Sequence, residues 1–298
     1  MIASIIILYA LCASTFTLSK AILTYSQPLF YVGIRMLVAG ILLYGYYRIR
    51  QKGPATIKPG DWHLFLQIVI FHIYIAYVFD LWALQFITSI ESSVIYNFLP
   101  FVSAFFSYLW FNEVMTPKKW VGLAIGSASL IPVFINSDVS FYHSTQCVPV
   151  IVMLGAVASS AYGWILLREL VKNRNYSPIM VNGLGMIGGG IAALATSFGF
   201  ESWSPLPITS WGPFIILTVA IIIVANFIFY NFYGYLLKYY TATFLAFAGF
   251  MCPLFAMLFG WFFLGETITT NFFYSVIAVA VGLYLFYQEE LRQGYIKH

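Results

Sequence analysis

Charged residues are scarce in this sequence, and their scarcity sets the class of protein. Only 8% of the 298 residues are Asp, Glu, Lys or Arg, whereas 61% are hydrophobic. Soluble domains carry about 25% charged residues, so this chain has too few polar side chains to cover a surface that faces water. The composition therefore predicts an integral membrane protein.

Several sequence motifs typical of metal sites, nucleotide sites and catalytic sites are also missing. The three cysteines fall inside apolar runs and lack metal-ligand spacing, so we expect neither disulfides nor a metal site. No glycine cluster has the strand–loop–helix setting of a phosphate-binding loop. The four histidines are scattered along the chain. The sequence predicts no catalytic residues and no cofactor, and any pumping has to draw on a gradient or on exchange.

The sequence is instead built from apolar runs long enough to cross a bilayer, which takes about 20 residues. No stretch alternates polar and apolar residues as a membrane β-strand would. No basic leader or cleavage site precedes the first run, so we expect it to be retained as a helix. We predict an all-α membrane protein with ten transmembrane helices, at residues 2–22, 28–50, 61–84, 88–111, 117–135, 147–170, 178–199, 211–237, 241–264 and 270–288.

The basic residues predict the orientation of these helices. If the N-terminus is cytoplasmic, every Lys and Arg except Lys20 and Arg35 falls in a cytoplasmic loop or tail. Cytoplasmic loops of membrane proteins carry the excess of positive charge. We therefore expect both termini inside and a multi-pass protein of the cell (inner) membrane. The net charge of +4 is explained by this topology, so no nucleic-acid partner is expected.

One segment of the sequence occurs twice. FLPFVSAFFSYLWFNE at 98–113 matches MCPLFAMLFGWFFLGE at 251–266, with a proline and a final glutamate at the same places 153 residues apart. A proline inside a helix frees a backbone carbonyl that lipid cannot satisfy. We interpret the repeated segment as one kinked, mobile helix in each half of the chain, lining a cavity.

Each half contains five of the ten expected spans. Because five is an odd number, the second half enters the membrane upside down relative to the first. Inverted repeats of this kind are typical of secondary transporters, whose substrate site lies between the halves. We predict one five-helix repeat at 1–135, an outer linker at 136–146, and a second five-helix repeat with a short cytoplasmic tail at 147–298.

Two stretches of the chain resemble a known family. They read ALQFITSIESSVIYNFLPFVSAFFSYLWFNEVMTPKKWVGLAIG in the first half and YLLKYYTATFLAFAGFMCPLFAMLFGWFFLGETIT in the second. Both resemble EamA-type members of the drug/metabolite transporter superfamily, and the likeness extends over essentially the whole chain. It implies two inverted five-helix bundles, alternating access, and export or exchange of small organic solutes. Asn112 departs from the small or aliphatic residue usual in the family.

Three ionisable residues inside the spans are candidates for binding substrate. A charge within a span costs at least about 2.5–3.5 kcal/mol on insertion scales, so each requires a reason. Arg35 is interpreted as an anchor for a substrate carboxylate, with an internal ion pair as the alternative. Lys20 either contacts substrate or extends to the outer surface. Asp80 is the acid we select for a substrate amine or for coupling.

Uncharged polar residues near the expected cavity complete the predicted substrate site. Their hydrogen bonds between membrane helices contribute only about 0.6 kcal/mol on average, so they are compatible with a binding role. These residues are Tyr77, Tyr96, Asn97, Asn226 and Tyr230.

A second group of residues is assigned to coupling or gating. His72 lies near the middle of a span, where it either relays protons or packs as a neutral interhelical residue. Glu91 fits a capping box, the structural alternative to a coupling role. Glu113 and Glu266 end their helices at opposite membrane faces and are interpreted as architectural residues that also act in gating. The full group is His72, Glu91, Glu113, Glu266, Pro100 and Pro253.

The leading functional hypothesis is a secondary transporter of a small polar metabolite. Basic and acidic groups in one bundle suit a zwitterion such as an amino acid. The many aromatic side chains suit a sulfonium or aromatic group by cation–π attraction and stacking, which makes S-adenosylmethionine a specific candidate. An exporter of amphipathic or cationic drugs is the alternative.

A membrane-embedded lipid-modifying enzyme is the hypothesis from another class. The scattered histidines and the absence of a paired-acid motif disfavour it. The expected partners are a small-molecule substrate and the lipid bilayer, and a homodimer is left open.

Overall fold

The computed structural model describes residues 2–50, 56–87, 92, 95–135, 147–264 and 270–296. The regular secondary structure of this part of the chain is helical and includes no β-strand, as predicted. The helical elements are α1 (Ile2–Ile22), α2 (Pro28–Arg50), η1 (Pro59–Asp61), α3 (Trp62–Gln67), η2 (Ile68–Ile75), α4 (Ala76–Ala83), α6 (Leu99–Phe111), α7 (Pro117–Ile135), α8 (Cys147–Arg168), η4 (Glu169–Asn173), α9 (Pro178–Phe200), α10 (Trp211–Ile221), η5 (Ile222–Phe229), α11 (Tyr230–Leu236), α12 (Ala242–Ala248), α13 (Met251–Leu264) and α14 (Thr270–Arg292). Of these, η1 is a short 3-10 helix, and η2, η4 and η5 are π-helical segments.

Six continuous helical segments in the described part are long and apolar enough to cross a membrane. They correspond to the first, second, third, sixth, seventh and eighth of the expected spans. Two shorter apolar helices, Leu99–Phe111 and Ala242–Phe255, fall within the expected fourth and ninth spans. The six segments are Ser4–Ile22, Pro28–Arg50, Pro59–Ala83, Cys147–Asn173, Pro178–Phe200 and Trp211–Leu236.

The two repeated prolines coincide with breaks in the helices. A turn at residues 97–98 precedes α6, and a turn at residues 249–250 separates α12 from α13. Pro100 and Pro253 therefore lie in the first turn of the helix that follows each break. The missing N–H group of proline is tolerated there, because the first residues of a helix have no carbonyl to bond. The kinks expected near the middle of each span thus coincide with a turn just before each proline.

The helices α2 and α9 form one extensive contact, and its glycines are arranged reciprocally. A Cβ atom at Gly40 would lie 2.7 Å from the backbone nitrogen of Ile187, and one at Gly190 would lie 2.6 Å from that of Leu37. The two glycines and the two partner residues are each 150 positions apart in the sequence. A contact that repeats with its partners exchanged is the pattern expected of helices related by a two-fold pseudo-symmetry.

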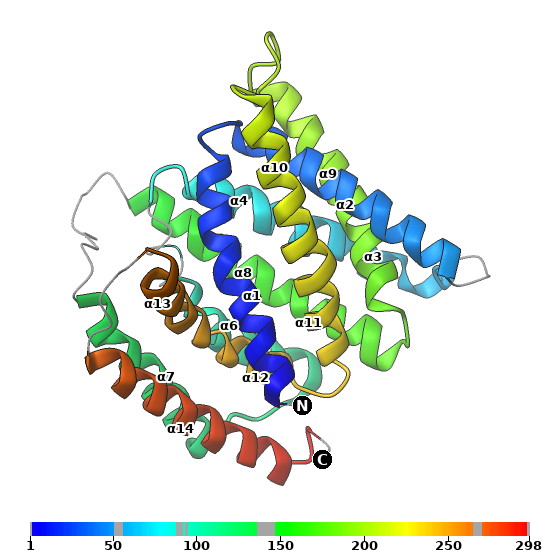
Figure 1. The fold of residues 1–298 in the computed structure, drawn as a ribbon. Helices are drawn as coiled ribbons and strands as arrows, with labels where there is room; N and C mark the ends of the chain where they lie inside the picture. Colours follow the sequence, from blue (N-terminus) through cyan, green and yellow to red (C-terminus); the bar gives the residue numbers. More distant parts are fainter. Residues whose placement is uncertain are drawn as a thin grey trace.

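A second glycine contact joins α7 to α14. A Cβ atom at Gly122 would lie 2.8 Å from the carbonyl oxygen of Gly282, so the two backbones touch. Small residues permit such close approach between membrane helices. In Figure 1 the pair α7–α14 lies on one side of the molecule and the pair α2–α9 on the other, with α1 between them. The N and C marks lie close together at the bottom of this view.

The opposite end of the bundle is held by contacts between two connections. The carboxylate of Glu201, which follows α9, accepts hydrogen bonds from the backbone N–H groups of Leu29 at 2.8 Å and Phe30 at 2.7 Å. These two groups belong to the first turn of α2, where helix N–H groups lack internal partners. Ser26 also forms an isolated antiparallel bridge with Ile208. The connection before α2 is therefore fixed to the one after α9.

Candidate functional site

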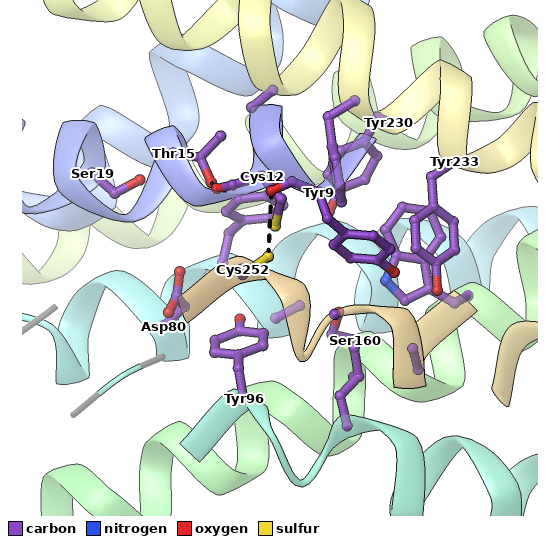
Figure 2. A pocket seen from close by; sticks show the side chains of 18 of the residues that line it. Tyr9, Cys12, Thr15, Ser19, Asp80, Tyr96, Ser160, Tyr230, Tyr233 and Cys252 are labelled. Atoms are coloured by element: carbon purple, nitrogen blue, oxygen red, sulfur yellow. Dashed lines mark hydrogen bonds between the residues drawn. The ribbon is translucent and has the colours of Figure 1, made fainter. Parts of the chain in front are cut away.

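A cavity of about 130 Å³ lies in the middle of the bundle. Side chains from α1, α2, α4, α8, α11 and α13 line it, so both halves of the chain contribute (Figure 2). Six of the eight residues predicted to bind substrate are among its lining residues. These six are Arg35, Tyr77, Asp80, Tyr96, Asn97 and Tyr230.

Arg35 extends from α2 to the cavity and is only 2% exposed. Its Nε donates to Oδ1 of Asn226 at 2.9 Å. The guanidinium carbon lies 5.0 Å from the centroid of the Tyr77 ring and 6.0 Å from that of Tyr31. The guanidinium thus bonds to a neutral amide and lies over two aromatic rings, neither of which carries a compensating charge.

Asp80 faces the same cavity from α4 but is not joined to Arg35. The two groups interact electrostatically, yet no ion pair within 4.0 Å links them among the described residues. Asp80 Oδ1 is buried and, within the described part of the chain, has no hydrogen-bond partner. Buried polar atoms are normally satisfied, so this oxygen is available to a ligand.

Lys20 is engaged by the backbone. Its ammonium group donates to the carbonyl oxygen of Leu84 and, at 2.8 Å, to that of Ile87. Both carbonyls lie at or just beyond the end of α4, where helix carbonyl groups lack internal partners and a cation is favoured. The structure thus shows Lys20 bonded to carbonyl groups at the end of α4, and its contact with substrate stays a prediction.

Asn226 and His72 occupy matching π-helical segments. The segment η5 follows η2 at an interval of 154 residues, and the two polar residues are separated by the same interval. Such wide helical turns are rare and frequently found at functional sites. Asn226 reaches Arg35, and its Nδ2 also contacts the sulfur of Met36 at 3.3 Å. His72 is fully buried, and neither ring nitrogen has a hydrogen-bond partner in the described part.

A cluster of aromatic side chains lines part of the same cavity. Trp164 of α8 stacks on Tyr233 of α11 with ring centroids 3.9 Å apart and an interplanar angle of 28°. Its ring centroid also lies 4.9 Å from that of Tyr230 and 4.5 Å from that of His72. Trp164 and both tyrosines line the cavity, whereas His72 packs behind Trp164 and is not a lining residue.

Sequence reasoning did not single out Trp164, Tyr233 or Tyr9 as site residues. A signal was present for Trp164, because it lies within a span and immediately follows Gly163. A Cβ atom at Gly163 would lie 2.5 Å from the Cβ of His72, so this glycine allows α8 to approach the imidazole. Tyr9 carried no comparable signal. Its hydroxyl donates to the carbonyl oxygen of Leu245, a partner that only the tertiary structure reveals.

The predicted gating residue Glu113 is part of a buried ion pair. Its Oε1 lies 2.6 Å from Nη2 of Arg168, at the junction of α6 and α8. The guanidinium of Arg168 also stacks over the ring of Phe111, with 4.5 Å to the centroid. The pair therefore ties the end of α6 to the end of α8. Glu91 and Glu266, which were assigned to the same group, lie outside the described residues.

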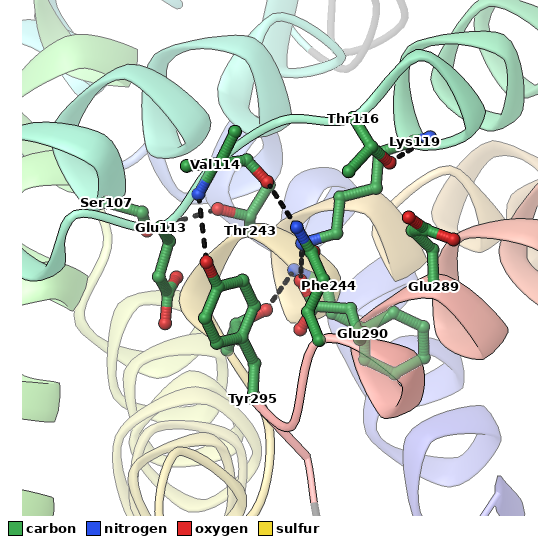
Figure 3. A network of polar contacts seen from close by, with 12 residues as sticks. Ser107, Glu113, Val114, Thr116, Lys119, Thr243, Phe244, Glu289, Glu290 and Tyr295 are labelled. Carbon is green, nitrogen blue, oxygen red and sulfur yellow. Dashed lines mark hydrogen bonds and ion pairs between the residues drawn. The ribbon is translucent and has the colours of Figure 1, made fainter.

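Further polar contacts surround this ion pair at the end of the bundle where both termini lie (Figure 3). The hydroxyl of Thr243 at the start of α12 donates to Ser107 Oγ of α6 at 3.1 Å. Nζ of Lys119 on α7 lies 2.5 Å from Oε1 of Glu290 on α14. The backbone N–H of Val114 donates to the hydroxyl of Tyr295 at 3.1 Å. These contacts join α6, α7, α8, α12 and α14 at this end of the bundle.

Comparison with known proteins agrees with this architecture. The EamA-like transporter family matches residues 1–135 and again residues 148–288. A solved crystal structure of another protein has a TM-score of 0.76, with 15% sequence identity over 97% of this chain and 96% of its own. That likeness shows the fold alone.

Curated relatives match over nearly the whole chain. Proteins named S-adenosylmethionine/S-adenosylhomocysteine transporter from Chlamydia muridarum and Chlamydia trachomatis serovar L2 are 35% and 34% identical over 95% of this chain, covering 90% and 88% of their own lengths. A Bacillus subtilis protein named as the transporter YvbV is 26% identical over 90% of this chain and 85% of its own. The chain therefore belongs to the EamA-like transporter family, which makes it a multi-pass membrane transporter rather than an enzyme.

Proposed function

We propose that this transporter is a secondary carrier for S-adenosylmethionine and S-adenosylhomocysteine, which it moves by alternating access as an exchanger. In this proposal ten helices cross the membrane as two inverted five-helix repeats, at 1–135 and 147–298, with both termini in the cytoplasm. The two separate matches to the family, at 1–135 and 148–288, support the division. The exchanged glycine contacts of α2 and α9 support the inversion.

The substrate assignment rests on one observation: the cavity holds charged groups and an aromatic wall in separate places. Arg35 and Asp80 lie together without forming an ion pair, while Trp164, Tyr230 and Tyr233 form an aromatic wall. S-adenosylmethionine has the same separation, because its amino-acid group and its adenine ring lie at opposite ends. The relatives named for this substrate, at 34–35% identity over 95% of the chain, support the same assignment.

Each part of the substrate has a complementary group in the cavity. The guanidinium of Arg35 suits the carboxylate, since its planar N–H groups match two carboxylate oxygens. The free oxygen of Asp80 suits the ammonium group. The ring faces of Tyr77 and Tyr230 suit the sulfonium by cation–π attraction, which contributes about 0.5–2 kcal/mol. A cage of neutral rings also accepts the uncharged thioether of S-adenosylhomocysteine, as exchange between the two molecules requires.

The cavity in this structure is contracted relative to an occupied site. Its volume of about 130 Å³ is well below the roughly 300–1,000 Å³ of ligand pockets. The closed network around Glu113 and Arg168 lies at the end of the bundle that the proposed topology assigns to the cytoplasm. We assign Glu113 and Arg168 to the inner gate and Pro100 and Pro253 to the flexible breaks, and substrate binding then requires the bundle to widen.

Equilibrium binding to the purified protein tests the site. Arg35→Gln and Asp80→Asn should each weaken binding of S-adenosylmethionine about 10–150-fold, because each removes a charge-assisted hydrogen bond that contributes about 1.5–3 kcal/mol. Arg292→Gln is the matched control, since Arg292 is 67% exposed and pairs with Glu289 at the cytoplasmic end of α14. Equal affinities in all three variants, or binding of hydrophobic cations alone, would contradict the proposal and favour a drug exporter.

A further inference from the structure

Two of the three cysteines line the same cavity. Cys12 of α1 and Cys252 of α13 both line it, although they come from opposite ends of the chain. The third cysteine, Cys147, is exposed at the start of α8. No pairing of these cysteines was expected from their positions in the sequence, and all three are free thiols in the structure.

The contact between the two thiols is direct. The side chains of Cys252 and Cys12 interact, and Cys252 Sγ donates to the carbonyl oxygen of Tyr9 at 3.8 Å. Tyr9 lies one turn before Cys12 on the same helix. Figure 2 shows both cysteine side chains in the space between α1 and α13. A disulfide requires the two Cα atoms to lie within about 7 Å, and Cys12 and Cys252 line one small cavity from two helices that pack against each other.

We propose that Cys12 and Cys252 are a redox-sensitive latch, in which oxidation by a peroxide joins α1 to α13 and arrests the transporter with its cavity contracted. The effect on transport rests on the proposed function, but the formation of the bond does not. A disulfide at this point crosses from the first half of the chain to the second. It therefore prevents the relative movement of the halves that alternating access requires.

Hydrogen peroxide can oxidise the two thiols to a disulfide in two steps. The thiolate of one cysteine attacks the O–O bond of hydrogen peroxide, which gives a sulfenic acid and, with the thiol proton, one molecule of water. The second thiol then attacks the sulfenic sulfur, forming the disulfide and releasing a second water. The two thiols lose two electrons and two protons, and the peroxide is reduced to water. A dithiol such as dithiothreitol reverses the reaction by thiol–disulfide exchange.

The latch is specific to the contracted state because the cavity lies between the two helices. At about 130 Å³ the cavity is too small for a ligand of ordinary size, so a bound substrate has to move α1 away from α13. Separation of the helices also separates the thiols. We therefore expect bound substrate to slow the formation of the disulfide.

The test uses the full-length protein in proteoliposomes treated with hydrogen peroxide, with free thiols counted before and after. The Cys147→Ser variant should lose both of its thiols, the wild type should lose all three because the exposed Cys147 is oxidised as well, and each should yield a peptide cross-linked between Cys12 and Cys252 by mass spectrometry. Their counterflow of S-adenosylmethionine should stop and return with dithiothreitol. Peroxide should leave the transport rate of Cys12→Ser and of Cys252→Ser unchanged relative to the same variant without peroxide, and bound substrate should protect the wild type.

Two results would overturn the latch. One is the absence of the cross-linked peptide after full oxidation of Cys147. The other is equal inhibition of the wild type and of both serine variants by peroxide. The thiol count and the peptide do not depend on which solute is carried. If the cross-link forms in a protein that shows no counterflow of S-adenosylmethionine, the proposed substrate is wrong and the oxidation site remains.

Discussion

Arg35 shows how a buried charge can be held in a membrane protein without an opposite charge bonded to it. Asn226 accepts one hydrogen bond from its Nε, and the rings of Tyr77 and Tyr31 lie close to the guanidinium. Neither contact neutralises the charge, and Asp80 remains without an ion pair in the described part of the chain. The arrangement keeps both groups available to a ligand that carries opposite charges at one end.

The aromatic wall gives the prediction that belongs at this scale. Replacing Trp164 with Ala should weaken binding of S-adenosylmethionine about 2–12-fold, because an aromatic contact contributes about 0.5–1.5 kcal/mol. Binding of methionine, which lacks the adenine ring, should change much less. Equilibrium binding of both ligands measures the difference, and Trp164→Phe should recover part of the lost affinity. An equal loss for the two ligands would show that Trp164 acts only through packing.

The sequence predicted individual residues unevenly. Arg35 and Asp80 stood out because a charge inside a span is costly, and the structure places both at the cavity. Lys20 stood out for the same reason, but its position at the end of α4 gives it backbone partners. Trp164 and Cys12 were not identified, because aromatic and small apolar residues are common in membrane helices and their facing depends on tertiary packing.

At the scale of the helices, glycine contacts determine how closely the two halves approach. Gly40→Ala should lower the melting temperature of the purified transporter, because the added Cβ would lie 2.7 Å from the backbone of α9 and overpacking typically costs about 1–3 kcal/mol. Gly45→Ala on the same helix meets no atom within 4 Å and is the matched control. The two variants can be compared in one thermal denaturation experiment. Equal melting temperatures would mean that α2 and α9 do not pack as described.

Two buried ion pairs at the cytoplasmic end of the proposed topology should behave differently. Glu113–Arg168 joins α6 to α8 and is the pair proposed as the inner gate, whereas Lys119–Glu290 joins α7 to α14, which already touch through glycine backbones. Removing one partner of a buried pair leaves an uncompensated charge at a cost of about 3–5 kcal/mol. The first loss should favour an open inner gate, and the second should reduce stability alone.

Thiol labelling from the cytoplasmic side distinguishes these outcomes. In a Cys147→Ser background, Glu113→Gln should increase labelling of Cys12 and Cys252 by a membrane-impermeant maleimide in inside-out vesicles. Glu290→Gln should lower the melting temperature without changing the labelling. If Glu290→Gln exposes the cavity cysteines as strongly as Glu113→Gln, the gate cannot be assigned to one pair.

The helical elements were more predictable than their interruptions. Most expected spans agree with the observed helices within a few residues, because long apolar runs with short connections leave little choice of boundary. Pro100 and Pro253 predicted that the fourth and ninth spans are irregular. That a turn precedes each proline, and that η2 and η5 are π-helical, depends on packing against neighbouring helices.

At the scale of the whole molecule, the distribution of basic residues predicts a topology that can be tested. With both termini in the cytoplasm, Cys147 lies at the outer end of α8 and is exposed. A membrane-impermeant maleimide added to intact cells should therefore label Cys147 in the wild type and fail to label Cys147→Ser. A cysteine introduced at Gln293, which follows α14, should react only after the cells are opened. The reverse pattern would place both termini outside.

The overall fold was largely predictable from the sequence, whereas for the substrate the sequence only narrowed the range of candidates. The proline–glutamate segment and its copy 153 residues later indicated the family, and the family match over both halves confirms it. The contact between Cys12 and Cys252 was not predictable, since it depends on how the two halves come together in space. The substrate depends on the shape of the same cavity, for which the sequence supplies only the chemical groups.

Counterflow in proteoliposomes tests the central claim most directly. Vesicles loaded with unlabelled S-adenosylhomocysteine should transiently accumulate labelled S-adenosylmethionine from outside, and Arg35→Gln and Asp80→Asn should lose most of this accumulation while Arg292→Gln retains it. Only a carrier that binds both molecules at one alternately exposed site gives this overshoot. Folded protein that equilibrates the label without an overshoot, or that exchanges only hydrophobic cations, would contradict the account.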